Sequence, residues 1–148
     1  MVVVLQRCKS AKVIVLGKII ASIKKGMVLF LGVENTDSEK DVNFLVDKIS
    51  DLRVFNDINN KTNLSIKDVN GSILIISQFT LCADINKGRR PSFFKAANHQ
   101  KGEKLYKNFI FELSKKKITC QNGQFGSIMD IDLINDGPFT LVLNSNKS

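Results

Sequence analysis

Residues 72–93, SILIISQFTLCADINKGRRPSF, decide the fold and contain the first candidate site. The run of four apolar residues at 73–76 follows the turn signal Asn70-Gly71 and is bounded by polar residues. Such a short apolar run with β-branched residues predicts a buried strand. We therefore expect this strand to lie at the centre of a sheet.

Polar residues follow where this strand is predicted to end. Ser77, Gln78 and Thr80 come first, and a loop with glycine and cations, including Arg90, comes next. Hydroxyl groups and free backbone N–H groups beside cations are what a site for a polyanionic ester requires. The strand end is therefore a candidate site.

Alternation along an extended strand gives these residues two faces. Ser77, Phe79 and Leu81 would share one face, unless the strand bends. Gln78 and Thr80 would then share the other. On composition alone, this pentapeptide is a plain strand end more often than a functional site.

The rest of the chain mixes strands and helices. Apolar runs and two-residue alternation predict strands over residues 2–7, 12–16, 19–23, 27–33, 129–133 and 139–143, while residues 64–69 fit either a short strand or an irregular link. A capping-box pattern at Ser38 and apolar residues at helical spacing predict a helix from 38 to about 52 or 54, and a second helix is predicted over 102–116. Several strands look antiparallel, so the fold class is α+β.

Composition indicates one cytoplasmic domain. The chain has 148 residues, 43% of them hydrophobic and 24% charged, which is typical of a globular protein. No apolar run is long enough to span a membrane, and the first residues do not resemble a signal peptide. The net charge of +8 favours a phosphate-rich partner such as nucleic acid, although a basic protein without such a partner explains it equally well.

Residue types exclude several classes of chemistry. The three cysteines form no CxxC pair and His99 is the only histidine, so we predict no metal site and no cofactor. His99 lies in a polar stretch before the second predicted helix, where an exposed structural role is the better interpretation. A serine–histidine mechanism would depend on that one residue, and neither a GxSxG elbow nor a P-loop is present.

A second unusual stretch is NDGPFT at residues 135–140. One interpretation is a hairpin turn with Pro138 at the start of the next strand, a position that proline tolerates. The other is a functional element, because a Gly-Pro bond adopts the cis form at small cost and Gly137 leaves backbone carbonyls accessible. The residues alone do not decide between them.

Together, SQFTL at 77–81 and NDGPFT at 135–140 resemble the two signature motifs of the D-aminoacyl-tRNA deacylases. The resemblance covers essentially the whole chain, because the stretches at 5–7, 31–34, 53–55, 88–93 and 125–129 also match. It implies a single domain over residues 1–148 with a mixed, largely antiparallel sheet of barrel-like form and two main helices.

The resemblance also implies a function. It implies a cytoplasmic homodimer, without metal or membrane partner, that hydrolyses the ester between a D-amino acid and the tRNA 3′ end, glycyl-tRNA included. The implied catalytic residues are Ser77, Gln78, Phe79 and Thr80, and the implied substrate-binding residues are Leu81, Gly137, Pro138, Arg7, Met129 and Arg90. In this arrangement the Gly-Pro dipeptide, in cis, reaches into the site of the other subunit.

A mechanism without histidine fits the residues present. An aminoacyl ester is an activated bond, so positioning, backbone N–H groups near Phe79 and the ribose 2′-hydroxyl of the substrate would suffice for hydrolysis. Thr80 is a candidate nucleophile, but no neighbour in sequence would activate it, which favours a positioning role.

Two alternatives stay open. A related deacylase group with a trans Gly-Pro and relaxed chirality removes misattached L-alanine. The resemblance implies that Arg7 pins a cis dipeptide, and its presence favours the D-specific group instead. The other alternative is a basic RNA-binding module without catalysis. Such a module normally carries aromatic stacking platforms, whereas this chain has no Trp and one Tyr.

Overall fold

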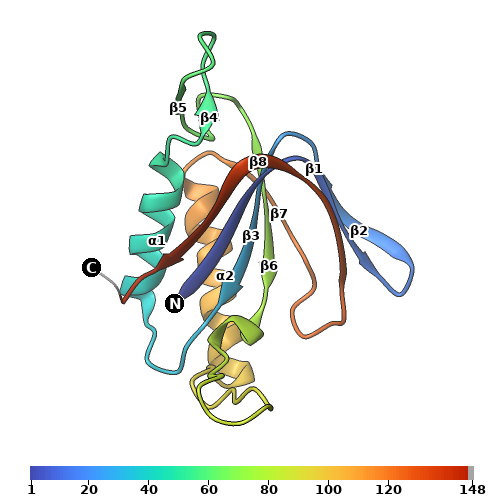
Figure 1. Cartoon of the computed structure of the whole chain (residues 1–148), viewed down its shortest axis with the longest axis vertical. Helices are drawn as coiled ribbons and strands as arrows, with labels where there is room; N and C mark the ends of the chain where they lie inside the picture. The colour runs from blue at the N-terminus through green and yellow to red at the C-terminus, as the bar shows by residue number, and fades with distance from the viewer. Residues whose placement is uncertain (147–148) are drawn as a thin grey trace.

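The computed structural model describes residues 1–146 and shows two helices packed on a strongly curved mixed sheet (Figure 1). The strands are β1 (Val2–Val15), β2 (Lys18–Ile23), β3 (Gly26–Gly32), β6 (Ser72–Ser77), β7 (Thr119–Asn122) and β8 (Asp130–Asn144). Their order is β2-β1-β3-β6-β7, and β8 pairs with β1. The β3–β6 and β6–β7 pairs are parallel and the other pairs are antiparallel, as expected for a mixed, largely antiparallel sheet.

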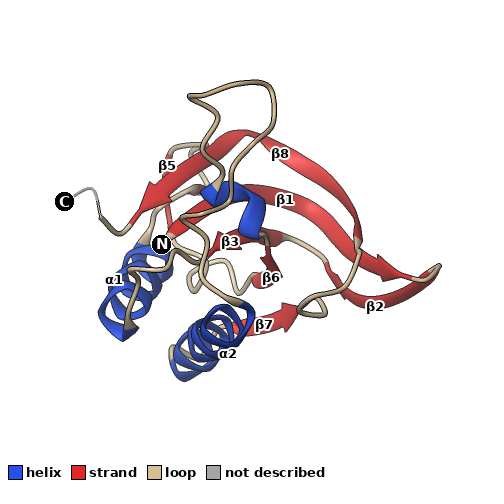
Figure 2. Ribbon diagram, turned by 90° about the horizontal axis from the view of Figure 1, so that it is seen from below, coloured by secondary structure: helices blue, strands red, loops and turns tan. Residues whose placement is uncertain are grey.

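The helices α1 (Glu39–Asp51) and α2 (His99–Lys115) lie on one side of this sheet (Figure 2). The predicted capping box forms at the start of α1, where the Ser38 N–H donates to Asp41 at 2.8 Å. The second helix begins three residues earlier than predicted, because Asn98 caps it by accepting a hydrogen bond from the Lys101 N–H at 2.8 Å. None of the helices in the described residues is long and apolar enough to cross a membrane.

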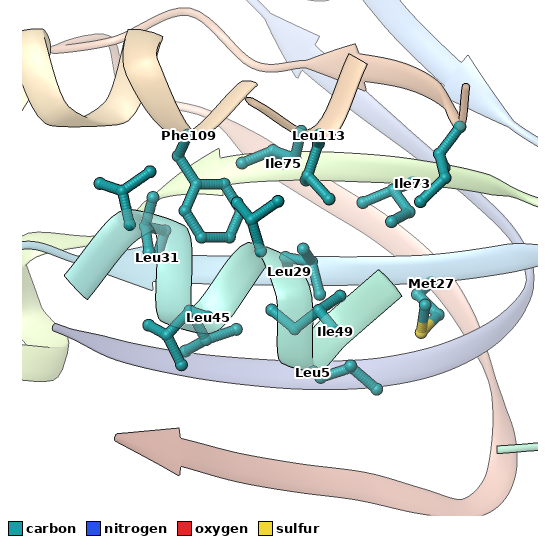
Figure 3. Close-up of a cluster of buried hydrophobic side chains, with 14 of the residues drawn as sticks. Leu5, Met27, Leu29, Leu31, Leu45, Ile49, Ile73, Ile75, Phe109 and Leu113 are labelled. Carbon is teal, nitrogen blue, oxygen red and sulfur yellow. The ribbon is translucent and has the colours of Figure 1, made fainter. Parts of the chain in front are cut away.

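The central strand β6 is buried on both faces, as its apolar run predicts. Ile73 and Ile75 belong to the main core with the helices, and Leu74 and Ile76 belong to a second cluster on the opposite face. Figure 3 shows the main core, in which side chains from α1 and α2 meet those of β1, β3 and β6. The labelled residues are Leu5, Met27, Leu29, Leu31, Leu45, Ile49, Ile73, Ile75, Phe109 and Leu113.

Two pairs of predicted strands are single long strands. Residues 2–7 and 12–16 join in β1, because its first half pairs with β3 and its second half with β2, so the polar residues between them stay in the sheet. The strands predicted at 129–133 and 139–143 join in β8, which begins at Asp130 and pairs with β1 along its length. The hairpin-turn interpretation of residues 135–138 is therefore wrong: they lie inside β8, where its register with β1 shifts near Cys8.

The end of β6 also differs from the predicted alternation. After Ser77 the chain does not stay extended but forms a short 3-10 helix, η1 (Phe79–Cys82). Strand β7 was not predicted, because its sequence is short and polar. Residues 64–69 are mostly turn, and only Leu64 belongs to a strand, β5 (Thr62–Leu64), which pairs with β4 (Phe55–Asn56) in a small separate sheet.

Candidate active site

A cavity of about 550 Å³ lies where β6 ends. Its walls come from η1, the start of α2 and the loop between β7 and β8. The lining residues that matter below are Ser77, Gln78, Phe79, His99, Phe125 and Met129. Apart from His99, the lining contains no ionisable side chain, so the cavity suits a largely neutral aromatic group better than a charged one.

The turn from β6 into η1 leaves two backbone donors free. The Gln78 N–H donates to the Leu31 carbonyl at 2.8 Å and the Leu81 N–H donates to the Gln78 carbonyl at 3.2 Å. By contrast, within residues 1–146 the Phe79 and Thr80 N–H groups have no acceptor. These two N–H groups are available to an anionic oxygen at the site.

The hydroxyl of Thr80 is held by its neighbour rather than activated. The Gln78 side-chain amide donates to Thr80 Oγ1, which makes the hydroxyl oxygen an acceptor. An amide N–H is not a base, so this contact orients Thr80 without raising its nucleophilicity. The positioning role of Thr80 stays a prediction.

An aromatic wall closes one side of the cavity. The Phe125 ring lies 5.1 Å from the His99 ring, edge to face, and 5.5 Å from the Tyr106 ring. The Phe125 ring also packs over Gly102, where a Cβ would lie 3.4 Å from the end of the ring, an ordinary van der Waals contact. His99 is exposed, as predicted, but it also lines the cavity, which the sequence did not indicate.

Tyr106 supports this wall from the core. Its hydroxyl donates to the Ile75 carbonyl at 2.9 Å, on the strand that leads to the site. Burial raises the pKa of Tyr106 well above its ordinary value, so the phenol stays neutral and the bond persists. This contact fixes α2 against β6.

Met129 is placed by a glycine that sequence reasoning missed. A Cβ at Gly123 would lie 2.6 Å from Met129 Sδ and 3.4 Å from Ile76 Cδ1. Any larger residue at 123 would therefore displace Met129 from the cavity wall.

Arg7 joins the second motif to the core. The Gly137-Pro138 bond is cis. The buried Arg7 guanidinium donates from Nη2 to the Gly137 carbonyl at 3.0 Å and from Nε to the Asp136 carbonyl at 3.1 Å, and it also bonds the Val54 carbonyl. The guanidinium therefore fixes the exposed dipeptide from the buried side.

Not all the predicted site residues meet in one chain. Ser77, Gln78, Phe79 and Met129 line the cavity. The others lie outside its lining: Thr80 and Leu81 in η1, Arg90 in the following loop, and Arg7, Gly137 and Pro138 on β1 and β8. The cavity of one chain therefore lacks the Gly-Pro dipeptide of the same chain.

Cys82, at the end of η1, is not a nucleophile. Its side chain is buried, with Sγ 3.5 Å from the Val33 carbonyl. Burial raises the pKa of the Cys82 thiol to about 11, so the thiolate is scarce at neutral pH. In the described part of the chain there is also no cluster of His, Cys, Asp and Glu that would hold a metal ion.

Comparisons with known proteins agree on one family. The family model described as D-Tyr-tRNA(Tyr) deacylase matches residues 4–144. The D-aminoacyl-tRNA deacylase of Thermodesulfovibrio yellowstonii is 50% identical over 145 residues, covering 98% of this chain and 99% of the relative. The D-aminoacyl-tRNA deacylase of Dictyoglomus turgidum is 48% identical, covering 96% of this chain and 91% of the relative.

Solved structures show the same fold. A structure titled c-Myc DNA Unwinding Element Binding Protein has a TM-score of 0.91 and 36% identity, covering 97% of this chain and 98% of that one. A structure described as a probable eukaryotic D-amino acid tRNA deacylase has a TM-score of 0.83 at 17% identity, covering 96% of this chain and 97% of that one, a likeness of fold alone.

Proposed function

The chain belongs to the D-Tyr-tRNA(Tyr) deacylase family, and we propose that it hydrolyses the ester bond of D-aminoacyl-tRNA, releasing the free D-amino acid and tRNA. As a member of this family it is a hydrolase that acts on aminoacyl-tRNA, and its role is chiral proofreading. The residues that perform the reaction, the subunit arrangement and the cytoplasmic location form part of the proposal.

The observation that carries the mechanism is the pair of free N–H groups at Phe79 and Thr80 beside the cavity. A cavity of about 550 Å³ suits a nucleoside, so we place the 3′-terminal adenosine there. Its ribose ester would then lie at η1, close to both donors.

The reaction needs no protein nucleophile in this arrangement. Water adds to the ester carbonyl, and the Phe79 and Thr80 N–H groups stabilise the oxyanion that forms. The intermediate then breaks the bond to the ribose 3′-oxygen, which takes up a proton as it leaves. The 2′-hydroxyl of the substrate is positioned to assist this proton transfer, and Gln78 and Thr80 hold the substrate in place.

A homodimer supplies the missing dipeptide. Gly137 and Pro138 are exposed, and β8 pairs with β1 only among the described strands, which leaves its outer edge open. Ile134 and Val142 on the same strand are 55% and 73% exposed. We propose that residues 1–148 form one domain and that two copies meet across a twofold axis, each dipeptide entering the other cavity. An active monomer in sedimentation would contradict this arrangement.

Selection of D substrates follows from backbone groups. A carbonyl oxygen has two lone pairs, so the Gly137 carbonyl can accept from Arg7 and also from the α-ammonium of the substrate. With the α-ammonium held there, an L side chain would point into the dipeptide, while a D side chain or the hydrogen of glycine would not. This steric clash would reject L substrates with any side chain.

The test compares hydrolysis of D-tyrosyl-, L-tyrosyl- and glycyl-tRNA by the pure protein. We expect cleavage of the D and glycyl esters and not of the L ester. Equal cleavage of both tyrosyl esters would indicate the relaxed-chirality alternative. Binding of tRNA without hydrolysis would indicate an RNA-binding module.

Gly137→Ala sharpens this test. Apart from residues 136–138 themselves, a Cβ at Gly137 would have no atom of its own chain within 4 Å, so the variant should fold with unchanged thermal stability. We nevertheless expect it to lose D-ester hydrolysis, because the added methyl group would meet the substrate or the partner subunit. Full activity of the variant would place the dipeptide outside the site.

A further inference from the structure

The loop after η1 carries a group of cations that the proposed reaction does not use. Residues 84–92, here called the basic arch, are closed at their base by two hydrogen bonds: the Asp84 N–H donates to the Ser92 carbonyl at 2.7 Å, and the Ser92 N–H donates to the Asp84 carbonyl at 2.9 Å. Gly88 turns the chain at a φ of +71°, with no atom within 4 Å of a Cβ placed there. The arch projects from the molecule beside η1 (the yellow loop of Figure 1).

The charge of the basic arch is not compensated. Lys87, Arg89 and Arg90 are exposed and form no ion pair within residues 1–146. The arch contains one acid, Asp84, whose pKa is lowered by the backbone N–H of Asn86 and by a nearby lysine outside the arch. The arch is therefore a site of concentrated positive charge.

The lysines of α2 provide the contrast. Three of them, and Lys116 just after the helix, are paired with acids of α1 or α2: Lys104–Glu39, Lys107–Glu103, Lys115–Glu112 and Lys116–Asp47. Most of the charge on this helix is thus satisfied within the protein, whereas the arch presents its cations to solvent.

The basic arch is fixed next to the cavity. Phe93 follows it directly and lies 5.1 Å from Phe79, edge to face. The chain beyond is bound to the end of β3, because the Ala97 N–H donates to the Val33 carbonyl at 2.9 Å. Arg90 is three residues from Phe93, so its Cα is within about 11 Å of the Phe93 Cα.

Exposed apolar side chains accompany these cations. Ile85 is 74% exposed and Phe94, just beyond the arch, is 65% exposed. Cations combined with an exposed aromatic ring are typical of surfaces that follow a single strand of nucleic acid, where the ring stacks on a base.

We infer that the basic arch binds the phosphates of the single-stranded 3′ end of tRNA as it leads from the acceptor stem to the cavity. The inference rests on the proposed function, because the cavity must hold the terminal adenosine. The arch then contributes to affinity for the whole tRNA and not to the chemical step.

The test replaces Lys87, Arg89 and Arg90 together with glutamine. With D-tyrosyl-tRNA we expect KM to rise on the order of tenfold or more at low salt, with kcat unchanged. The slope of log(kcat/KM) against log salt should fall by about 2, because each lost single-strand phosphate contact removes about 0.7. With D-tyrosyl-adenosine, which lacks these phosphates, both constants should stay within twofold.

A matched control replaces Lys18, Lys24 and Lys61, three exposed lysines away from the cavity lining, with glutamine. An equal rise of KM in this control would show that net charge alone matters and would overturn the inference. An equal rise of KM for D-tyrosyl-adenosine in the arch variant would also overturn the inference, because the arch would then affect binding in the cavity itself. Dissociation of the dimer in sedimentation would assign the arch to the subunit interface instead.

Binding of uncharged tRNA, followed by fluorescence anisotropy over a salt series, separates this inference from the proposed function. If the wild type binds tRNA without hydrolysing any ester, the proposed function fails, and the arch variant still tests the inference. Equal affinity and equal salt slope for the variant and the wild type would overturn it.

Discussion

The main core under the helices and the η1 end of the sheet use the same strand in different ways. Along β6, the apolar side chains of Ile73 and Ile75 are fully buried in the main core, and the Ile75 carbonyl accepts hydrogen bonds from Tyr106 and Gly123. A few residues on, the Phe79 and Thr80 N–H groups have no acceptor in the described chain, and the Phe79 side chain is 56% exposed. Stability therefore comes mainly from one part of the strand, while the chain beyond its other end keeps two donors free, which we propose bind the ester oxygen.

The largest expected effect is on stability. Phe109 is fully buried against both helices and the sheet, so Phe109→Ala should lower the free energy of unfolding by about 3–5 kcal/mol. Chemical denaturation measures this change. Phe111→Ala on the exposed side of α2 is the control and should lower the free energy of unfolding much less. A large loss of kcat in folded Phe109→Ala would mean that the two regions are not separate.

Arg7 connects the core to the exposed dipeptide, since it bonds the carbonyls of Val54 and Gly137. We expect Arg7→Ala to lower kcat/KM for D-tyrosyl-tRNA by about 100-fold, the scale of a misplaced binding group, and to reduce discrimination against the L ester. Steady-state kinetics on both esters measure this. Arg7→Lys keeps the positive charge but not the several donors of the guanidinium, so its kcat/KM should lie between those of the wild type and Arg7→Ala. Unchanged selectivity in Arg7→Ala would show that the position of the dipeptide does not determine discrimination between D and L esters.

Thr80→Ala tests the η1 end alone. Because Gln78 orients the Thr80 hydroxyl and no base contacts it, we expect turnover to fall by about tenfold, the scale of one lost hydrogen bond, with stability unchanged. Thr80→Ser should retain most of the activity. A trapped acyl-Thr80 intermediate in mass spectrometry would instead show covalent catalysis.

The smallest effect is expected at His99. Although it lines the cavity, the proposed reaction uses no imidazole base, so His99→Ala should leave kcat within about twofold. Activity should likewise survive EDTA. Loss of most of kcat in a folded His99→Ala protein would require a general-base mechanism, and loss on chelation would require a metal.

Sequence patterns predicted those elements whose local residue pattern matches their burial in the fold. The apolar run of β6, the capping box at Ser38 and the amphipathic helices all appear where expected, because each depends on neighbours in sequence. The continuity of β1 and β8 was missed, because it depends on their pairing with each other from opposite ends of the chain, which keeps polar residues such as Ser10 within a strand.

The site residues stay predictions. The motif around Ser77 and the Gly-Pro dipeptide were singled out from the sequence, the resemblance implied their roles, and the structure adds the hydrogen bonds from Arg7 to the Asp136 and Gly137 carbonyls. The roles of Gly123 and of His99 were missed, because packing against Met129 and Phe125 leaves no pattern in a single sequence. A glycine between polar residues was the only available signal for position 123.

The length of β8 determines which cavity of a dimer each Gly137-Pro138 dipeptide would reach. Ile131, which lines the cavity, and Gly137 are six residues apart on this strand. In an extended strand this separation is about 20 Å, so a subunit cannot fold its own dipeptide back into its own cavity. Two inactive variants should therefore complement each other: a subunit with Gly137→Ala mixed with a subunit defective at η1 would form hybrids with one intact site, and activity should reappear on mixing.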